Sequence, residues 1–96
     1  MTLHIKFLVQ ADEDIKRLYT FLSDINISAA KKALQAIYAD IVLLSLHPEI
    51  GRPLRRPLYV RERCVNFGAR GYVIHYRATE TDLIIIRIWH GSETRL

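Results

Sequence analysis

The sequence contains a single cysteine, Cys64, and this scarcity excludes several classes of site. One cysteine cannot form an internal disulfide or a metal site built on thiolates. The four histidines, at positions 4, 47, 75 and 90, show no metal-ligand spacing either. We therefore expect neither a metal nor another cofactor, and the unpaired thiol fits a reducing cytoplasm.

Long apolar runs and a glycine-rich phosphate loop are also missing. No stretch approaches the roughly 20 apolar residues that a membrane helix needs. The N-terminal MTLHIKFLVQADEDIK lacks a basic segment followed by an apolar one and a cleavage site. GARG, at residues 68–71, is too short for a phosphate loop and lies between predicted strands. The sequence predicts a soluble intracellular protein without a membrane partner.

Positive charge is in excess, with 14 Lys and Arg against 10 Asp and Glu and a net charge of +4. Such an excess favours an acidic partner, either nucleic acid or an acidic protein segment, although a basic surface also serves solubility. The chain has 96 residues and half of them are hydrophobic, so we expect one domain over residues 1–96.

The first half of the chain reads as one strand followed by two helices. Apolar residues alternate over 3–9 and then take helical spacing over 11–25, with three acidic residues near the start of that helix. Asn26 and Ser28 interrupt the helix, and either can cap a second one over 28–46, which His47-Pro48 ends. Two helices with almost no linker predict an antiparallel hairpin.

The second half reads as an antiparallel meander. After PEIGRPLRRPLY, residues 48–59, the period becomes two, and strands are predicted over 60–67, 71–78 and 82–90. The helix pair and the sheet each have an apolar face, so they should cover each other. We therefore predict an α+β domain with two layers, in which a helical hairpin packs on an antiparallel sheet. The order is β-α-α-β-β-β, and the first strand is expected to join the sheet.

The register of the last hairpin predicts which side chains face the helices. If the ATET turn is centred near Glu80, one face is apolar throughout and should meet the helices. Its residues are Tyr72, Ile74, Tyr76, Ile84, Ile86 and Ile88. The opposite face carries Val73, His75, Arg77, Leu83, Ile85, Arg87 and Trp89. Arg61 and Arg63 of the preceding strand are expected to extend this second face.

The mixed face has two interpretations. An antiparallel sheet often leaves one face wet, and charged residues belong there. However, Trp89, Leu83 and Ile85 are not residues chosen for solvation, and arginine grips phosphate or carboxylate in a fixed geometry. A face that mixes arginine with aromatic and aliphatic side chains favours a binding surface.

Metal-free RNA cleavage is the enzymatic alternative that this face leaves open. The reaction needs a base near the 2′-hydroxyl, cations around the phosphate and an acid for the leaving oxygen. Some of these roles could be filled by Arg61, Arg77, Arg87 and His90. Glu62 could serve as the base only if it faced the same way, but alternation places it opposite Arg61.

Three segments in this order, PEIGRPL, VRERCVNFGARGYVIHYR and IIIRIWHGSETR, resemble the RelE/ParE family of toxins from bacterial toxin–antitoxin modules. The resemblance covers nearly the whole chain, and the ending Ile88-Trp89-His90-Gly91 is more similar to the ParE and plasmid-stabilisation branch. It implies a toxin that a ParD-like antitoxin holds inactive in a hetero-oligomer. ParE-like toxins trap DNA gyrase with cleaved DNA, whereas RelE-like toxins cleave messenger RNA in the ribosome.

The resemblance implies a gyrase inhibitor, and not an enzyme, as the leading function. A metal-independent ribonuclease acting on messenger RNA in the ribosome is the first alternative, and a degenerate toxin that only binds its antitoxin is the second. Gly91 stands where some nuclease relatives have Tyr, and the tail HGSETR is less basic than most ParE-like endings. The expected target-contacting residues are Arg61, His75, Arg77, Arg87, Trp89, His90 and Arg95, within a surface that includes the tail over 92–96.

Four apolar residues lie partly outside the predicted core stripes, namely Leu8, Phe21, Leu43 and Leu46. We expect them to bind an apolar, partly helical segment of the antitoxin. The alternative is that they complete the core.

Overall fold

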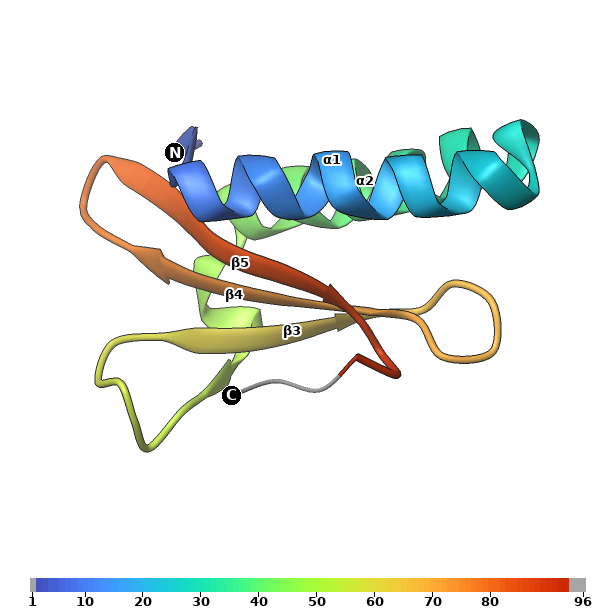
Figure 1. Ribbon diagram of the computed structural model, residues 1–96. Helices are drawn as coiled ribbons and strands as arrows, with labels where there is room; N and C mark the ends of the chain where they lie inside the picture. Colours follow the sequence, from blue (N-terminus) through green and yellow to red (C-terminus); the bar gives the residue numbers. More distant parts are fainter. Residues whose placement is uncertain (1, 94–96) are drawn as a thin grey trace.

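Two helices cover one face of a five-stranded sheet in the computed structural model, which describes residues 2–93 (Figure 1). The elements are β1 (His4–Phe7), α1 (Val9–Ile25), α2 (Ile27–Leu46), the 3₁₀ turn η1 (Pro48–Ile50), β2 (Arg52–Pro53), β3 (Arg61–Val65), β4 (Tyr72–Ala78) and β5 (Asp82–His90). The predicted order and the two layers are confirmed, and the structure adds the short strand β2 and the turn η1.

The sheet is mixed, because β1 pairs parallel to its neighbour whereas the other strands pair antiparallel. The strand order is β1-β5-β4-β3-β2, and neighbours among β2 to β5 are antiparallel. β1 instead runs parallel to β5, with His4 opposite Asp82 and Phe7 opposite Ile85. The first strand therefore joins the sheet as predicted, but the expected antiparallel pairing holds only for the other four.

Asn26 makes the helical hairpin tight because it ends one helix and starts the next. Its backbone is extended, with φ −163°, and its side-chain oxygen accepts a hydrogen bond from the Ala29 N–H at 3.1 Å. This bond satisfies one of the unpaired N–H groups at the start of α2. Of the two candidate caps, Asn26 and Ser28, the structure thus selects Asn26. None of the helices within residues 2–93 is long and apolar enough to cross a membrane.

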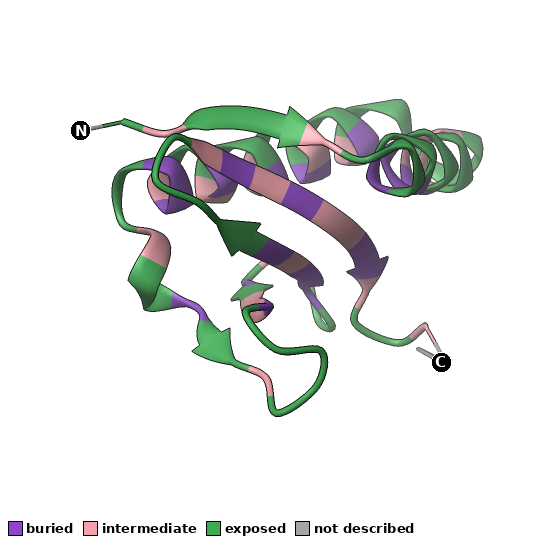
Figure 2. Ribbon diagram, turned by 90° about the vertical axis from the view of Figure 1, so that its left-hand side faces the viewer, coloured by how far each residue is buried: buried purple, intermediate pink, exposed green. Residues whose placement is uncertain are grey.

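The core lies between the helices and the sheet. Figure 2 shows buried residues alternating with half-buried ones along β5, as expected for a strand with one face in the core. Each large aliphatic side chain buried in this layer contributes about 1.5–3 kcal/mol. The large apolar side chains that are fully buried in the core are Ile37, Ile41, Leu44, Ile74, Tyr76, Leu83, Ile85 and Ile88.

A β-bulge in β5 changes the register of the last hairpin. His75 of β4 pairs with Arg87, but the next residue, Tyr76, pairs with Ile85. Ile86 is therefore the extra residue, without a partner in β4. One extra residue inverts the alternation of side chains on the bulged strand.

The inverted alternation makes part of the predicted core assignment wrong. Leu83 and Ile85, expected on the opposite face, are buried in the core with no exposed area. Ile84 and Ile86, expected in the core, are only half-buried. Ile88 lies beyond the bulge and faces the core as predicted.

Asp14 of α1 takes the place of a strand at one edge of the sheet. Among the described residues, β1 pairs only with the first half of β5. Beside the second half, the Asp14 carboxylate accepts hydrogen bonds from the backbone N–H of Ile88 at 2.9 Å and from the Arg87 guanidinium at 2.8 and 3.1 Å. Arg17, one turn later, donates to the same carboxylate at 2.6 Å. The helix thereby covers a strand edge that would otherwise be open.

These contacts decide the protonation state of Asp14, which is only 1% exposed. Burial by itself raises the pKa of the carboxyl, but the hydrogen bonds from Arg87, from the Ile88 N–H and from Arg17 outweigh it, so the pKa lies below its ordinary value. The carboxylate therefore stays charged to lower pH in the folded protein than in the unfolded chain.

Tyr76 fastens the turn η1 to the sheet from inside the core. Its hydroxyl donates to the Pro48 carbonyl at 2.6 Å and accepts from the Gly51 N–H at 2.9 Å. Burial raises the pKa of the phenol, so it stays protonated and able to donate. Position 51 requires glycine because a Cβ there would collide with the Tyr76 hydroxyl.

Replacing Asp14 with Asn is expected to lower the free energy of unfolding by about 2–4 kcal/mol at neutral pH. The cause is that Arg87 and Arg17 lose their shared carboxylate. Asp24→Asn, an exposed change on the same helix, should cost less than about 0.5 kcal/mol. Urea denaturation measures both values.

The pH dependence of the same variant gives a second test of the Asp14 contacts. A carboxyl whose folded-state pKa is lowered stabilises the fold above its unfolded pKa of about 3.9 and loses this effect as the pH falls through the folded pKa. The stability gap between wild type and Asp14→Asn should therefore narrow between pH 7 and about pH 3. A gap that stays constant over this range would contradict the network.

Replacing Tyr76 with Phe is expected to cost about 1–3 kcal/mol of stability, because two buried backbone groups lose their partner. Tyr38→Phe, on the exposed side of α2, is the matched change and should be nearly neutral. Thermal and urea denaturation of the two variants provide the comparison. Equal stability of Tyr76→Phe and Tyr38→Phe would show that the phenol does not hold η1.

Candidate functional site

The outer face of the sheet is the face turned away from the helices, and alternate residues of β3 to β5 form it. The pairing register places on it Glu62, Cys64, Val73, His75, Arg77, Ile84, Arg87 and Trp89. The predicted outer positions of His75, Arg77, Arg87 and Trp89 are therefore confirmed. Trp89 and Val73 are buried, so this face is more closely packed than a solvated sheet surface.

Five side chains from four strands form a row across the outer face, which we call the polar row: Arg52, Glu62, His75, Trp89 and Arg87. The Glu62 carboxylate accepts from Arg52 at 2.9 Å and lies 2.8 Å from His75 Nε2. The His75 ring meets Trp89 edge to face, with centroids 4.7 Å apart. The Arg87 guanidinium carbon lies 4.9 Å from the Trp89 centroid, within cation–π range.

Arg87 connects the polar row to the helical layer. Its guanidinium reaches past the edge of β5 to the buried carboxylate of Asp14, and this hydrogen bond raises the pKa of Arg87. The side chain is consequently held on two sides, by Trp89 and by Asp14. Removing Arg87 would disturb the sheet edge as well as the outer face.

Arg77 is an exposed arginine of the outer face. Its backbone pairs with Ile84 near the end of β4, and its side chain makes no hydrogen bond or ion pair with any residue of the described range 2–93. Its guanidinium is therefore available to a carboxylate or a phosphate of another molecule.

Arg61 and Arg63 do not lie on the outer face, so this prediction is wrong. The register places Arg61 opposite Tyr76 and Arg63 opposite Ile74, and both partners face the helices. Arg63 forms an ion pair with Asp40 of α2 at 3.1 Å. Because β3 reads RERCV, it has charged residues on both faces, and its apolar pattern is too weak to set the register.

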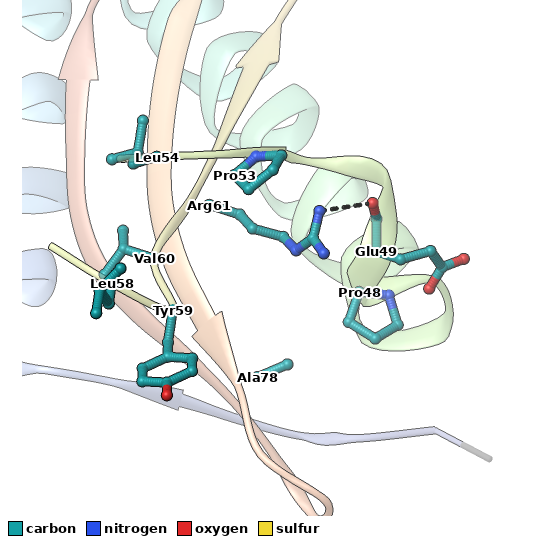
Figure 3. Close-up of a pocket in the computed structure, with 9 residues that line it drawn as sticks. All are labelled: Pro48, Glu49, Pro53, Leu54, Leu58, Tyr59, Val60, Arg61 and Ala78. Atoms are coloured by element: carbon teal, nitrogen blue, oxygen red, sulfur yellow. Dashed lines mark hydrogen bonds between the residues drawn. The ribbon is translucent and has the colours of Figure 1, made fainter. Parts of the chain in front are cut away.

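Arg61 instead holds the segment that follows α2. One guanidinium nitrogen donates to the backbone carbonyls of Glu49 at 3.1 Å and Gly51 at 2.7 Å. Figure 3 shows this side chain in the wall of a cleft of about 550 Å³ beside η1. Arg61 therefore links β3 to the turn η1 and to Gly51 through these hydrogen bonds.

His90 lies apart from the other members of the predicted ribonuclease set. It pairs with Tyr72, a residue that faces the helices, and the two rings are in edge contact with centroids 5.5 Å apart. Its Nδ1 lies 2.7 Å from the Ser92 hydroxyl. Arg61, Arg77, Arg87 and His90 thus occupy separate places and do not surround one common point.

Glu62 and Arg52 belong to the outer face although sequence reasoning left them out. Glu62 was expected opposite the cationic residues, yet its carboxylate contacts both Arg52 and His75. Counting back by twos from Val65, the buried apolar residue of β3, would have placed Glu62 outside. Within residues 2–93, no three His, Cys, Asp or Glu side chains converge as metal ligands.

The four residues expected to bind an antitoxin do not form one patch. Leu8, Phe21 and Leu46 are exposed, whereas Leu43 is half-buried. Leu8 and Leu46 lie at the open end of the hairpin, and Phe21 follows Leu8 by 13 residues, roughly 20 Å along α1. Phe21 instead lines a cavity of about 350 Å³ between α1 and the end of β5. Arg95 lies outside the described residues.

Over residues 5–95, the chain matches the family model described as ParE toxin of type II toxin-antitoxin system, parDE. It is 36% identical over 86 residues to Toxin RelE3 of Caulobacter vibrioides, and the alignment covers 90% of this chain and 91% of that protein. Its identity to Toxin RelE1 of the same bacterium is 33% over 95 residues, covering 99% of this chain and 100% of that protein.

Two solved structures have the same fold. A chromosomal ParDE toxin–antitoxin system from P. aeruginosa aligns with a TM-score of 0.72 and 23% identity over 93% of this chain and 96% of that chain. The RelBE2 toxin–antitoxin complex from Mycobacterium tuberculosis aligns with a TM-score of 0.62 and 22% identity over 94% and 99%. These likenesses confirm the two-layer fold, and the family match confirms the resemblance drawn from the sequence. The chain belongs to the ParE toxin family of type II toxin–antitoxin systems.

Proposed function

We propose that this toxin inhibits DNA gyrase by binding it, without a chemical step of its own. The observation that carries the proposal is the dispersion of the candidate catalytic set. Arg61 is used on backbone carbonyls, Arg87 is held by Asp14, and His90 lies on the other side of the sheet from Arg77. Binding requires a complementary surface and no such convergence.

The outer face is the proposed surface for the target. The polar row is fixed before any partner arrives, so little side-chain freedom would be lost on binding. Arg77 adds an exposed cation beside the row. His75, Trp89 and Arg87 are proposed to shape this surface, while Arg61 would contribute from the cleft, and His90 and Arg95 from the end of β5 and the tail.

A metal-independent ribonuclease is the second candidate, and one observation favours it. Glu62 and His75 lie 2.8 Å apart on the outer face, with Arg52 bound to the same carboxylate. A carboxylate and an imidazole at this distance are the components of a general acid–base pair. Both side chains are largely buried, however, which favours a structural role for the pair.

We also propose an antitoxin as the partner that neutralises the protein, since both solved neighbours are toxin–antitoxin systems. Phe21 is the strongest candidate for contact with it. The side chain is 63% exposed and borders a cavity whose other apolar lining includes Leu18, Leu22 and Tyr72. An apolar side chain of a helical segment could enter this cavity beside the phenylalanine ring.

Arg77→Gln is expected to weaken the inhibition of gyrase by about 5- to 100-fold, which corresponds to about 1–3 kcal/mol for one charge-assisted contact. Lys32→Gln on α2 removes the same charge from an exposed site off the sheet and should leave the inhibition unchanged. The measurements are gyrase supercoiling and gyrase-dependent DNA cleavage with the purified toxin. An equal effect of the two variants would contradict a role for the outer face.

Transcript cleavage on ribosomes distinguishes the second candidate. If the protein is a ribonuclease, replacing His75 with Gln or His90 with Ala should lower the cleavage rate by roughly 10²- to 10⁴-fold while substrate binding persists. Wild-type protein that leaves gyrase unaffected but cuts ribosome-bound messenger would overturn the gyrase proposal. Activity against neither target, with tight antitoxin binding, would identify a degenerate toxin.

Phe21→Ala is expected to weaken antitoxin binding by about 2–4 kcal/mol, as for a buried aromatic anchor. Because the Phe21 side chain is largely exposed in the free toxin, the substitution should change the stability of the toxin little. Leu58→Ala, at a similarly exposed site in the β2–β3 loop, should leave antitoxin affinity unaltered. Calorimetric titration measures both affinities, and an unchanged value for Phe21→Ala would refute this assignment.

A further inference from the structure

The loop between β2 and β3 exposes side chains that the fold does not use. This loop, residues 54–60 with the sequence LRRPLYV, is called the arginine–tyrosine loop below. A hydrogen bond of 2.9 Å from the Leu54 N–H to the Val60 carbonyl closes it at its base. Arg55 and Arg56 are exposed, and Leu58 and Tyr59 are 69% and 79% exposed. The loop thus has a fixed base and an exposed apex.

Tyr59 occupies a backbone position that favours glycine. The Val60 N–H donates to the Pro57 carbonyl at 3.4 Å, which makes residues 57–60 a turn with Tyr59 in third place. Its φ is +68°, and turns with positive φ at this place usually have Gly or Asn there. A tyrosine is strained in this conformation relative to glycine.

Packing within the protein does not compensate for this strain. The Tyr59 ring makes no aromatic or cation–π contact with the described part of the chain and is the most exposed of its large hydrophobic side chains. A strained position that presents an open ring points to a role in contacting another molecule.

The loop is positively charged, and no ion pair with another described residue neutralises its arginines. The side chains of Arg55 and Arg56 have no ion pair or hydrogen bond to any residue between 2 and 93. Glu62 is already engaged by Arg52 and His75, so it does not neutralise the loop. Glu49 lies on the opposite side of the cleft described above from Leu58 and Tyr59 (Figure 3).

Tyr59 forms one wall of that cleft. Figure 3 shows Leu58 and Tyr59 on one side and Pro48 and Glu49 on the other, with Ala78 between them. The volume of about 550 Å³ is within the range of binding pockets for small groups. A flat ring system can lie against Tyr59 in this space.

We propose that the arginine–tyrosine loop binds single-stranded nucleic acid, with one base stacked on Tyr59 and the flanking phosphates on Arg55 and Arg56. Stacking on an exposed aromatic ring and phosphate neutralisation are the two main sources of affinity for single strands. An acidic peptide would use the arginines but would not require a ring in a glycine position. The inference goes beyond the proposed gyrase inhibition and does not depend on it.

The test of Tyr59 uses the purified full-length protein and fluorescently labelled strands of about 12 nucleotides, a length within the range that such sites occupy. Tyr59→Gly is expected to weaken binding by about 5- to 100-fold, as for the loss of one stacked base. Its melting temperature should be equal or higher, because glycine relaxes the positive φ. Tyr59→Phe should bind like the wild type.

The test of the arginines uses the salt dependence of the same binding. Each phosphate contact on a single strand contributes about 0.7 to the slope of log affinity against log salt. Arg55→Gln/Arg56→Gln should therefore make the slope shallower by about 1.4. Lys31→Gln/Lys32→Gln removes the same charge from α2 and should leave the slope unchanged.

Parallel measurements with DNA, with RNA of the same sequence and with poly-glutamate distinguish the ligands. Binding of DNA, of RNA or of both supports the proposal. A difference between the two affinities identifies the preferred strand. The proposal is overturned if Tyr59→Gly binds the strands with wild-type affinity. It is also overturned if the two double variants make the salt slope shallower by the same amount. Tighter binding of poly-glutamate than of either strand assigns the loop to an acidic protein instead. Because the assay contains no gyrase, failure here leaves the gyrase proposal standing, and the reverse also holds.

Discussion

The buried carboxylate of Asp14 is the contact on which much of this structure depends. It covers the edge of β5 where β1 has ended, and it holds Arg87 at the rim of the sheet. Arg87 lies against Trp89, and Trp89 in turn contacts His75. The helical layer and the outer face are therefore joined through one charged group. A buried charge of this kind is tolerated because its hydrogen bonds compensate for the loss of water.

The arginines of this basic chain divide into two groups with different roles. Arg61, Arg63 and Arg87 are bound to carbonyls or carboxylates of the protein and hold its elements together. Arg55, Arg56 and Arg77 make no such contact within the described residues. Net charge alone does not reveal a binding surface, because a cation already paired in the fold contributes little to a partner. Of the unpaired group, Arg77 lies on the outer face, and Arg55 and Arg56 lie in the arginine–tyrosine loop.

Features set by local sequence signals were predicted correctly. The hairpin follows from the helical spacing of apolar residues and from Asn26, whose side chain caps α2 through a contact three residues away. The bulge in β5 left no such signal. Leu83 to Ile86 is a continuous aliphatic run, so either register puts large apolar residues in the core. Only the pairing with β4 selected Leu83 and Ile85 for burial, and only three-dimensional packing set β1 parallel to β5.

The sequence by itself determined the order of elements, the two layers and the family, because each rests on periodicity and on segments that lie close together in the chain. The tertiary structure decided which face each residue of β3 occupies. In RERCV a shift by one residue exchanges one charged side chain for another, so no hydrophobic penalty selects the register. Contacts with distant elements select it instead, through the Arg63–Asp40 ion pair and the bonds of Arg61 to Glu49 and Gly51. Glu62 thereby meets His75 on the outer face, a contact between strands that no local pattern encodes.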